Sequence, residues 1–210
     1  MDLQITSFVT APLETNTYVV ACNGTAAAVD PGMAPDAVVE YCRVQGFSLQ
    51  TVLITHGHGD HIAGAGDVLA AFAGARLTCP AGDADMLTDS TLNLSGPFGI
   101  DVTSPSPDDT VMPGDTVGIG DSTWLVLDTS GHTPAGVSYY CRDAGVVLTG
   151  DALFAGSIGR CDIPRASEMR LLGNIRDNLL SLPDDTRVLP GHGPETTIGT
   201  ERRSNPFLKL

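Results

Sequence analysis

Positive charge is scarce in this sequence of 210 residues. Lys209 is the single lysine, and Lys and Arg together number 11 against 25 Asp and Glu, which gives a formal net charge of −14. Affinity for nucleic acids and for anionic membrane surfaces depends on clustered Lys and Arg side chains. We therefore expect neither a nucleic-acid partner nor a membrane partner, and an anionic ligand would need a local positive group.

Long apolar runs are also missing. No stretch approaches the roughly 20 apolar residues that span a bilayer, and the N-terminal MDLQITSFV has an acidic second residue in place of the basic segment of a secretory signal. The cysteines are odd in number, widely spaced and without a C-x-x-C pair, which is typical of a reducing compartment. These features predict a cytoplasmic protein whose cysteines are mostly core residues: Cys22, Cys42, Cys79, Cys141 and Cys161.

The length and the 42% of apolar residues suit one domain, which we place at residues 1–210. Amphipathic patterns predict helices at 34–46, 61–75 and 166–182, and a segment rich in Ser, Pro, Asp and Gly predicts a loop at 89–116. The predicted strands are 3–10, 17–22, 25–30, 51–55, 76–80, 123–129, 137–141, 145–150 and 187–192.

Histidine is rare and unevenly placed. Of five histidines, three lie with an aspartate in the stretch HGHGDH, from His56 to His61. His132 and His192 lie far downstream, and each follows a glycine. A solvated turn in which Asp60 caps a helix would be the plainer interpretation, but the shared setting of all five histidines favours a metal site.

Each group of candidate ligands follows a predicted strand. His56 comes after VLIT, His132 after WLVLDTSG, Asp151 after VVLTG and His192 after RVLPG. Loops at strand ends over a rigid sheet commonly carry functional groups. Taken singly, His132 and His192 could be hydrogen-bonded structural residues and Asp151 an N-cap, but the agreement across four segments predicts one shared site.

The candidate ligands are too many for one tetrahedral ion. Imidazole and carboxylate groups suit Zn, Fe and Mn, and the side chains divide into two groups with one residue left to bridge them. We predict two divalent ions, zinc first with iron or manganese as alternatives, about 3.5 to 4 Å apart. The first would be held by His56, His58 and His132, the second by Asp60, His61 and His192, and both by Asp151.

A set of histidines and carboxylates that leaves room for water is typical of catalytic sites, whereas structural zinc sites are usually closed by cysteines. Two metals can share a hydroxide that attacks a carbonyl group, and they can stabilise the oxyanion that forms. The residues therefore predict a hydrolase, and we take Asp60 and Asp151 as its catalytic residues.

The motifs THGHGDH, GHT, TGD and PGHG resemble those of the metallo-β-lactamase superfamily, from the first strands to the last residues. Within it, VDPG, LFAGSIGRCD and GHGPETTIGTERRSNPFL are similar to single-domain glyoxalase II-like hydrolases, thioesterases related to hydroxyacylglutathione hydrolase. The resemblance implies an α+β fold, a four-layer αββα sandwich with the site at one edge of two sheets. It also implies the same two ligand groups, the same bridging aspartate, and a small-molecule thioester such as S-lactoylglutathione, cleaved through a bridging hydroxide.

Three features depart from glyoxalase II. Eighteen residues follow His192, where full-length glyoxalase II carries a further helical region that binds glutathione, so we expect weak discrimination between thiols. Arg160 stands where those enzymes have a lysine near the thioester, and Asp162 stands where they have an aromatic residue. We predict that Arg160 anchors the substrate, against the simpler interpretation of a surface ion pair with Asp162.

Other activities fit parts of the pattern. Persulfide dioxygenases are similar through GHT, TGD and GR-D and use one iron, which here would be held by His56, His132 and Asp151. They carry an Asp-Tyr pair after the last histidine, where this sequence has Gly193 and Pro194, so thioester hydrolysis is favoured. A lactonase is the next alternative, and a non-catalytic metal-binding protein is the last. The sequence carries no signal for the oligomeric state, the metal loaded or the exact acyl and thiol groups.

Overall fold

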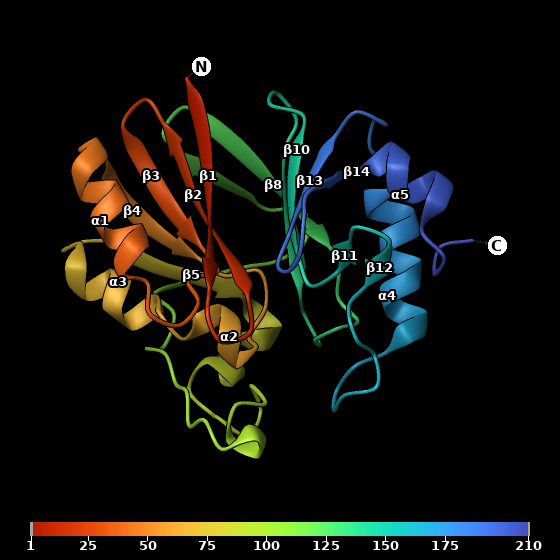
Figure 1. The fold of residues 1–210 in the computed structure, drawn as a ribbon, viewed down its shortest axis with the longest axis horizontal. Helices are drawn as coiled ribbons and strands as arrows, with labels where there is room; N and C mark the ends of the chain where they lie inside the picture. Colours follow the sequence, from red (N-terminus) through yellow and green to blue (C-terminus); the bar gives the residue numbers. More distant parts are fainter. Residues whose placement is uncertain (1, 210) are drawn as a thin grey trace.

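Two six-stranded sheets lie face to face, and helices cover the outer side of each sheet (Figure 1). This computed structural model describes residues 2–209; the predicted domain 1–210 also includes Met1 and Leu210, which lie outside the described residues. The layered arrangement confirms the predicted α+β fold, a four-layer αββα sandwich. No helix within 2–209 is long and apolar enough to cross a membrane.

The first sheet comprises β1 Leu3–Thr10, β2 Thr15–Cys22, β3 Thr25–Val29, β4 Ser48–Leu53, β5 Arg76–Pro80 and β6 Asp109–Val111. They lie in sequence order, antiparallel from β1 to β3 and parallel from β3 to β6. All of β2 and nearly all of β3 is buried, because alternate side chains enter the core between the sheets and the core beneath the outer helices. The parallel strands carry their C-terminal ends to one edge of the sandwich.

The second sheet comprises β7 Thr116–Ile119, β8 Ser122–Asp128, β9 Val137–Cys141, β10 Val146–Gly150, β13 Arg187–Pro190 and β14 Thr196–Thr197, in the order β14-β13-β10-β9-β8-β7. β10 and β13 pair in parallel, and the other neighbours are antiparallel. A small hairpin of β11 Leu153–Phe154 and β12 Ser157–Ile158 follows β10. The parallel pair places the segments after β10 and β13 at the same edge.

The helices divide between the two outer faces (Figure 1). On the first sheet lie α1 Asp36–Gln45 and α3 Ala65–Ala71, and the short α2 Gly59–Ile62 precedes α3 at the edge of the sheet. On the second lie α4 Glu168–Asn174, continued by a π-helical turn η3 Ile175–Leu179, and α5 Ile198–Ser204. Two 3₁₀ helices, η1 Ala81–Leu87 and η2 Gly96–Phe98, lie in the connections between β5 and β6.

Three apolar clusters fill the spaces between the layers. The central cluster joins the sheets and includes Trp124 and Tyr139, both fully buried, and the Tyr139 hydroxyl donates a hydrogen bond of 2.7 Å to the carbonyl of Ile54 in the other half. The other two clusters lie beneath the helices of each face. The cysteines are free, as predicted for core residues: four are buried, Cys161 is partly buried, and burial raises the pKa of the Cys42 thiol to about 11.

Two expectations for the elements are wrong in detail. The helix predicted at 61–75 is divided into α2 and α3 near Gly64, where the chain passes so close to the Gly32 carbonyl that a Cβ would lie 2.3 Å from its oxygen. The loop predicted at 89–116 contains η2 and the three-residue strand β6. β6 has no periodic signal of its own because its conformation comes from parallel pairing with the distant β5.

Candidate metal centre

Four chain segments that follow strands meet at one edge of the sandwich. The segment after β4 leads into α2 and carries four of the predicted ligands, and the segments after β8, β10 and β13 carry one each. Thr15 at the start of β2 forms an isolated antiparallel bridge with the residue after Gly191, which brings the two sheets together here. The residues that the structure gathers at this edge are His56, His58, Asp60, His61, His132, Asp151 and His192.

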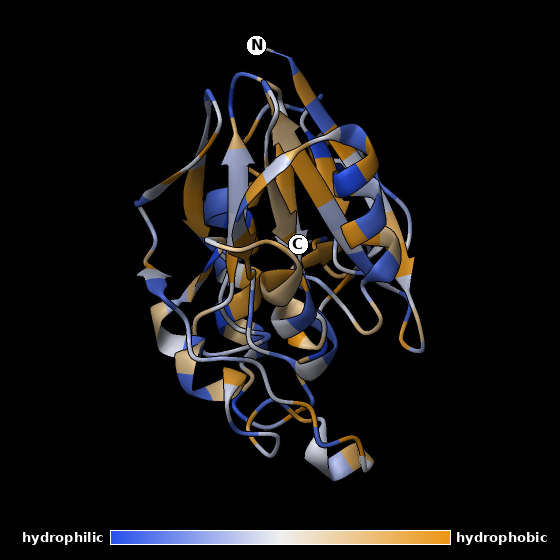
Figure 2. Cartoon of the chain, turned by 90° about the vertical axis from the view of Figure 1, so that its left-hand side faces the viewer, coloured by the Kyte–Doolittle hydropathy of each residue, from blue (hydrophilic) through white to orange (hydrophobic). Residues whose placement is uncertain are grey.

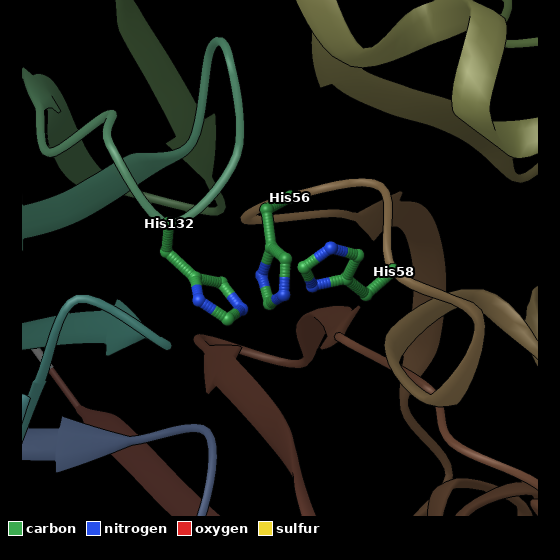
Figure 3. Close-up of side chains that lie close together, drawn as sticks. All are labelled: His56, His58 and His132. Atoms are coloured by element: carbon green, nitrogen blue, oxygen red, sulfur yellow. The ribbon is translucent and has the colours of Figure 1, made fainter. Parts of the chain in front are cut away.

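The first predicted ligand group is a compact set of three imidazoles. Ligand nitrogens of His56, His58 and His132 all lie within 4.8 Å of one another, and the three side chains come from two loops that face each other (Figure 3). All three residues are buried, with 2%, 7% and 8% of their surface exposed. Three buried nitrogens at this separation suit one small cation.

The second predicted group lies beside the first. Asp60 Oδ2 is 3.1 Å from His192 Nε2 and 3.4 Å from His61 Nε2, and it accepts a hydrogen bond of 3.0 Å from the hydroxyl of Thr15. Asp60 lies in the first turn of α2, whose N-cap is His58, so the interpretation of Asp60 as an N-cap is wrong. Its carboxylate instead points to the other members of its predicted ligand group.

Asp151 lies between the two groups. Its Oδ1 is 3.3 Å from His61 Nε2, and its Oδ2 is 3.5 Å from His132 Nε2 and 3.6 Å from His192 Nε2. The carboxylate therefore faces histidines of both groups, which is the position that a bridging ligand requires. Gly191 leaves room for this, because a Cβ there would lie 2.2 Å from Asp151 Oδ1.

The donor atoms that converge here fit divalent metal ions. His56 Nε2, His61 Nε2, His132 Nε2 and Asp151 Oδ1 are buried without a hydrogen-bond partner. Burying such atoms unpaired costs free energy, and native proteins rarely leave several of them together. A set of imidazoles and carboxylates with free lone pairs is typical of Zn, Fe or Mn sites.

Burial and neighbouring charges shift the pKa values of His56, His58 and His61 in different directions. Burial holds the pKa of His56 well below its usual value and lowers the pKa of His58 to about 3. Both imidazoles are therefore neutral near pH 7 and can offer a lone pair. Burial also opposes protonation of His61, but the neighbouring Asp60 carboxylate raises the pKa of His61 well above its usual value, so a metal would have to displace a proton there.

Asp30 orients the second group and was not predicted as a site residue. Its Oδ2 accepts from His61 Nδ1 at 3.0 Å and from the Thr55 hydroxyl at 2.6 Å, and its Oδ1 accepts from the Thr55 amide at 2.7 Å. Asp30 also approaches His56 and His61 closely enough to form a third candidate set. Because both its oxygens are occupied, it serves as the hydrogen-bond partner that fixes the ring of His61. The VDPG motif was the available signal.

Asp83 connects the two loops of the first group and was also missed. This fully buried carboxylate accepts from the amide of Gly57 at 3.1 Å and from the amide of Ala135 at 2.9 Å. Gly57 lies between two predicted ligands, and Ala135 lies three residues after His132. No sequence pattern reveals this role, because Asp83 follows β5 and lies far from both loops in the chain.

Arg160 lies next to the centre through its backbone. Its carbonyl oxygen accepts a hydrogen bond of 2.8 Å from His132 Nδ1, which leaves Nε2 of that ring free to bind a metal. Its guanidinium is mostly exposed and forms two hydrogen bonds, of 2.8 and 3.0 Å, with the Asp162 carboxylate. The surface ion pair considered from the sequence is thus present, and substrate binding by Arg160 stays a prediction.

A cavity of about 640 Å³ opens beside the centre. Predicted ligands from both groups line its floor, among them His58, Asp60 and His192, and Asp151 lies between them. The size is within the range of pockets that enclose a small organic molecule. The arrangement can therefore present a substrate to the metal-binding side chains.

Comparisons with known proteins agree with this geometry. The sequence profile of the Metallo-beta-lactamase superfamily matches residues 10–192. The chain is 39% identical over 199 residues to a probable metallo-hydrolase of Bacillus subtilis, YqgX, covering 94% of this chain and 93% of that protein. It is 35% identical over 185 residues to hydroxyacylglutathione hydrolase GloC of Haemophilus influenzae, covering 87% of each.

Solved structures show the same fold. BLEG-1, described as a B3 metallo-beta-lactamase, has a TM-score of 0.94 and 34% identity, with 99% of this chain and 100% of that chain covered. TTHA1623, solved in a di-iron-bound form, has a TM-score of 0.87 and 32% identity, with 97% and 100% covered. ETHE1 from Myxococcus xanthus has a TM-score of 0.78 and 28% identity, with 97% and 83% covered.

The profile match and the relatives decide the family, and the two face-to-face sheets with metal-binding side chains at one edge agree with it. The chain belongs to the metallo-beta-lactamase superfamily, whose members bind divalent metals and include metallo-hydrolases.

Proposed function

We propose that this protein hydrolyses thioesters at a centre for two divalent ions. The observation that carries the proposal is the position of Asp151, whose oxygens face His61, His132 and His192 and so connect the two ligand groups. The name of GloC supports thioesters as the substrate class. The di-iron form of TTHA1623 supports two ions. Zinc is our first choice of metal, with iron or manganese as alternatives.

Residues that are not candidate ligands orient the histidine rings of the site. The Asp30 carboxylate and the Arg160 carbonyl fix the rings of His61 and His132 so that their Nε2 atoms face the centre. When bound, two divalent ions supply an activated water near neutral pH and positive charge for the carbonyl oxygen. Asp60 and Asp151 border the cavity and balance that charge. Hydrolysis consumes one water, breaks the carbon–sulfur bond, and releases a carboxylic acid and a thiol.

The residues that would hold the ions follow the two groups described above. In this assignment the first ion would be held by His56, His58, His132 and Asp151, and the second by Asp60, His61, His192 and Asp151.

Elemental analysis combined with a thioester assay tests the proposal. We expect close to two Zn, Fe or Mn per chain and turnover of S-lactoylglutathione, even with a high KM. His58→Ala should lose metal and activity together, and Asp151→Ala should lose more of both, since one residue serves two ions. Asp85→Asn, on an exposed side chain, is the matched control. A fully metallated, active His58→Ala would contradict the assignment of the first ion.

A persulfide dioxygenase is the second candidate, and the likeness to ETHE1 favours it. Its single iron would be held by His56, His132 and Asp151. The geometry of Asp60, His61 and His192 argues for a further ion instead, because three more ligand atoms lie within 4.8 Å of one another. Iron near one per chain with oxygen consumption on glutathione persulfide would replace our proposal. Turnover of lactones without thioesters would favour a lactonase.

A further inference from the structure

The walls of the cavity beside the metal centre are mainly apolar. The predicted ligands form its floor, and large apolar side chains from four separate parts of the chain surround them. These side chains are Leu13 after β1, Met33 after β3, Leu94, Phe98, Ile100 and Val102 in the segment between η1 and β6, and Phe154 and Ile163 on the side of the second sheet.

Several of these side chains are exposed where the cavity opens. Phe98 is 75% exposed, Leu13 is 58% exposed and Ile100 is 38% exposed. The segment that carries Phe98 and Ile100 lies below the two sheets, at the bottom of Figure 1. Figure 2 shows orange, apolar stretches in the same region. Exposed apolar side chains are ordinary when they are scattered, but their grouping around one opening marks a binding surface.

The side chains around this opening offer no unpaired positive charge to a polyanionic substrate. Among the described residues that line the cavity, Arg160 is the only Arg or Lys. Its guanidinium is paired with the Asp162 carboxylate, and in the proposed centre Asp60 and Asp151 are themselves occupied in balancing the charge of the ions. Glutathione carries two carboxylates against one ammonium group, so its thioesters would meet no unpaired cation among these residues.

We propose that the preferred substrate is an uncharged thioester with an apolar arm of about six to ten carbons, a size that the cavity can enclose. The arm lies against Leu13, Phe98 and Ile100, and the carbonyl group reaches the floor between Asp60 and Asp151. This inference rests on the proposed thioester hydrolysis for its reacting bond. It adds that the group attached to the thioester is apolar and uncharged, and this group can be on either the acyl or the thiol side.

Two substrate series identify the side that carries the arm. In the first, acetyl, butyryl, hexanoyl and octanoyl groups are attached to N-acetylcysteamine; in the second, the acetyl group is attached to ethanethiol, hexanethiol or glutathione. We expect kcat/KM to rise at least tenfold with chain length in one series, since a fully buried methylene contributes up to about a fourfold gain. Turnover that is flat or falls with chain length in both series, or a preference for the glutathione thioester, overturns the inference.

Exposed wall residues provide variants that should still fold. Phe98→Ser and Leu13→Ser should reduce the gain from a long chain, with the octanoyl substrate losing about tenfold more than the acetyl substrate for Phe98→Ser. Phe207→Ser is the matched control, because Phe207 is 49% exposed and does not line the cavity. An equal effect of Phe98→Ser and Phe207→Ser on the chain-length dependence overturns the inference.

A binding measurement separates this inference from the thioester proposal. Amide analogues of the octanoyl and acetyl substrates, with nitrogen in place of sulfur, are titrated by calorimetry. Tighter binding of the octanoyl analogue, with a negative heat-capacity change that Phe98→Ser reduces, supports the apolar arm even when no thioester is hydrolysed. If thioesters are hydrolysed but both analogues bind equally well, the proposed reaction is supported and the inference of an apolar arm is overturned.

Discussion

At the scale of single residues, the centre depends on side chains that are not ligands themselves. Asp30 fixes the ring of His61, Asp83 ties two loops together, and the backbone carbonyl of Arg160 fixes His132. Such partners are buried or tightly bonded, and their removal disturbs ligands that they do not replace. Substituting these partners therefore tests how the candidate ligands are positioned, without removing a candidate ligand.

Asp83→Ala should destabilise the fold and weaken metal binding. It would leave the buried amide of Gly57 and the partly buried amide of Ala135 without their acceptor, and a fully buried unpaired donor costs about 1 to 3 kcal/mol. We expect the free energy of unfolding in urea to fall by at least about 2 kcal/mol, with Asp83→Asn in between because one acceptor oxygen remains. Asp85→Ala is the control: it breaks only an exposed pair with Arg165, worth about 0 to 1 kcal/mol.

Arg160→Ala tests the predicted substrate anchor. If the guanidinium binds the carbonyl or anionic end of a substrate, the variant should raise KM about tenfold, roughly 1.4 kcal/mol, with metal content unchanged, because the backbone carbonyl that bonds His132 is retained. Steady-state kinetics on the best thioester provide the measurement. Unaltered kinetics would show that Arg160 only pairs with Asp162 at the surface.

At the scale of elements, the parallel pair β10 and β13 brings Asp151 and His192 together at the candidate centre. Gly191 follows β13 and donates its amide to the Gly150 carbonyl at 2.8 Å, beside Asp151. Its missing side chain leaves space for the Asp151 carboxylate and for the ring of His61. The strand ends thus fix the position of the Asp151 carboxylate by close approach of two backbones.

Gly191→Ala should disrupt the centre without removing a ligand. The new Cβ would lie 2.2 Å from Asp151 Oδ1 and 2.7 Å from His61 Cε1, so both side chains or the backbone at residue 191 must shift. We expect metal affinity, measured by competition with a chelator, to fall about 10- to 100-fold, as when partners of ligands are lost. In Gly173→Ala the Cβ meets nothing within 4 Å, and a gain in stability of about 0.5 to 1 kcal/mol is expected there. Equal metal affinity of the two variants would contradict the close-approach argument.

At the scale of the whole molecule, the centre lies at the contact between two sheets and depends on their relative position. Polar contacts fix that position next to the site: the Asn16 side chain donates to the carbonyls of Pro190 and Gly193 at 2.9 and 2.8 Å. The Tyr18 hydroxyl donates to the same Pro190 carbonyl at 2.8 Å. The apolar cluster between the sheets supplies the larger stabilisation.

Leu148→Ala should destabilise the whole chain through that central cluster. Leu148 is 1% exposed, and truncating a buried leucine costs about 2 to 5 kcal/mol. Fluorescence of Trp124, the single tryptophan and fully buried, reports the unfolding transition. Val44→Ala, at a residue 70% exposed, should stay within about 0.5 kcal/mol. A loss as small as that of Val44→Ala would contradict a tightly packed contact between the sheets.

Much of the fold and the candidate ligands could be predicted from the sequence, because their signals are local. The strands that end before His56, His132, Asp151 and His192 have buried or alternating patterns, and the structure places them close to the predicted ranges. Residue type alone names the metal-binding chemistry, since imidazole and carboxylate carry it wherever they lie. The four-layer arrangement was not among these local signals; it was implied by the resemblance to the metallo-β-lactamase superfamily.

Features that form by contact between segments distant in the sequence were decided only by the tertiary structure. The strand β6 forms by pairing with β5, and the helix is interrupted near Gly64, whose amide donates to the Pro31 carbonyl instead of to the helix. The contact of Asp83 with two loops likewise requires all three segments in place. The sequence determined which side chains could bind a metal and which strands precede them. The three-dimensional packing determined which atoms stay unpaired, which partners orient them and how apolar the cavity wall is, because these are properties of neighbours in space.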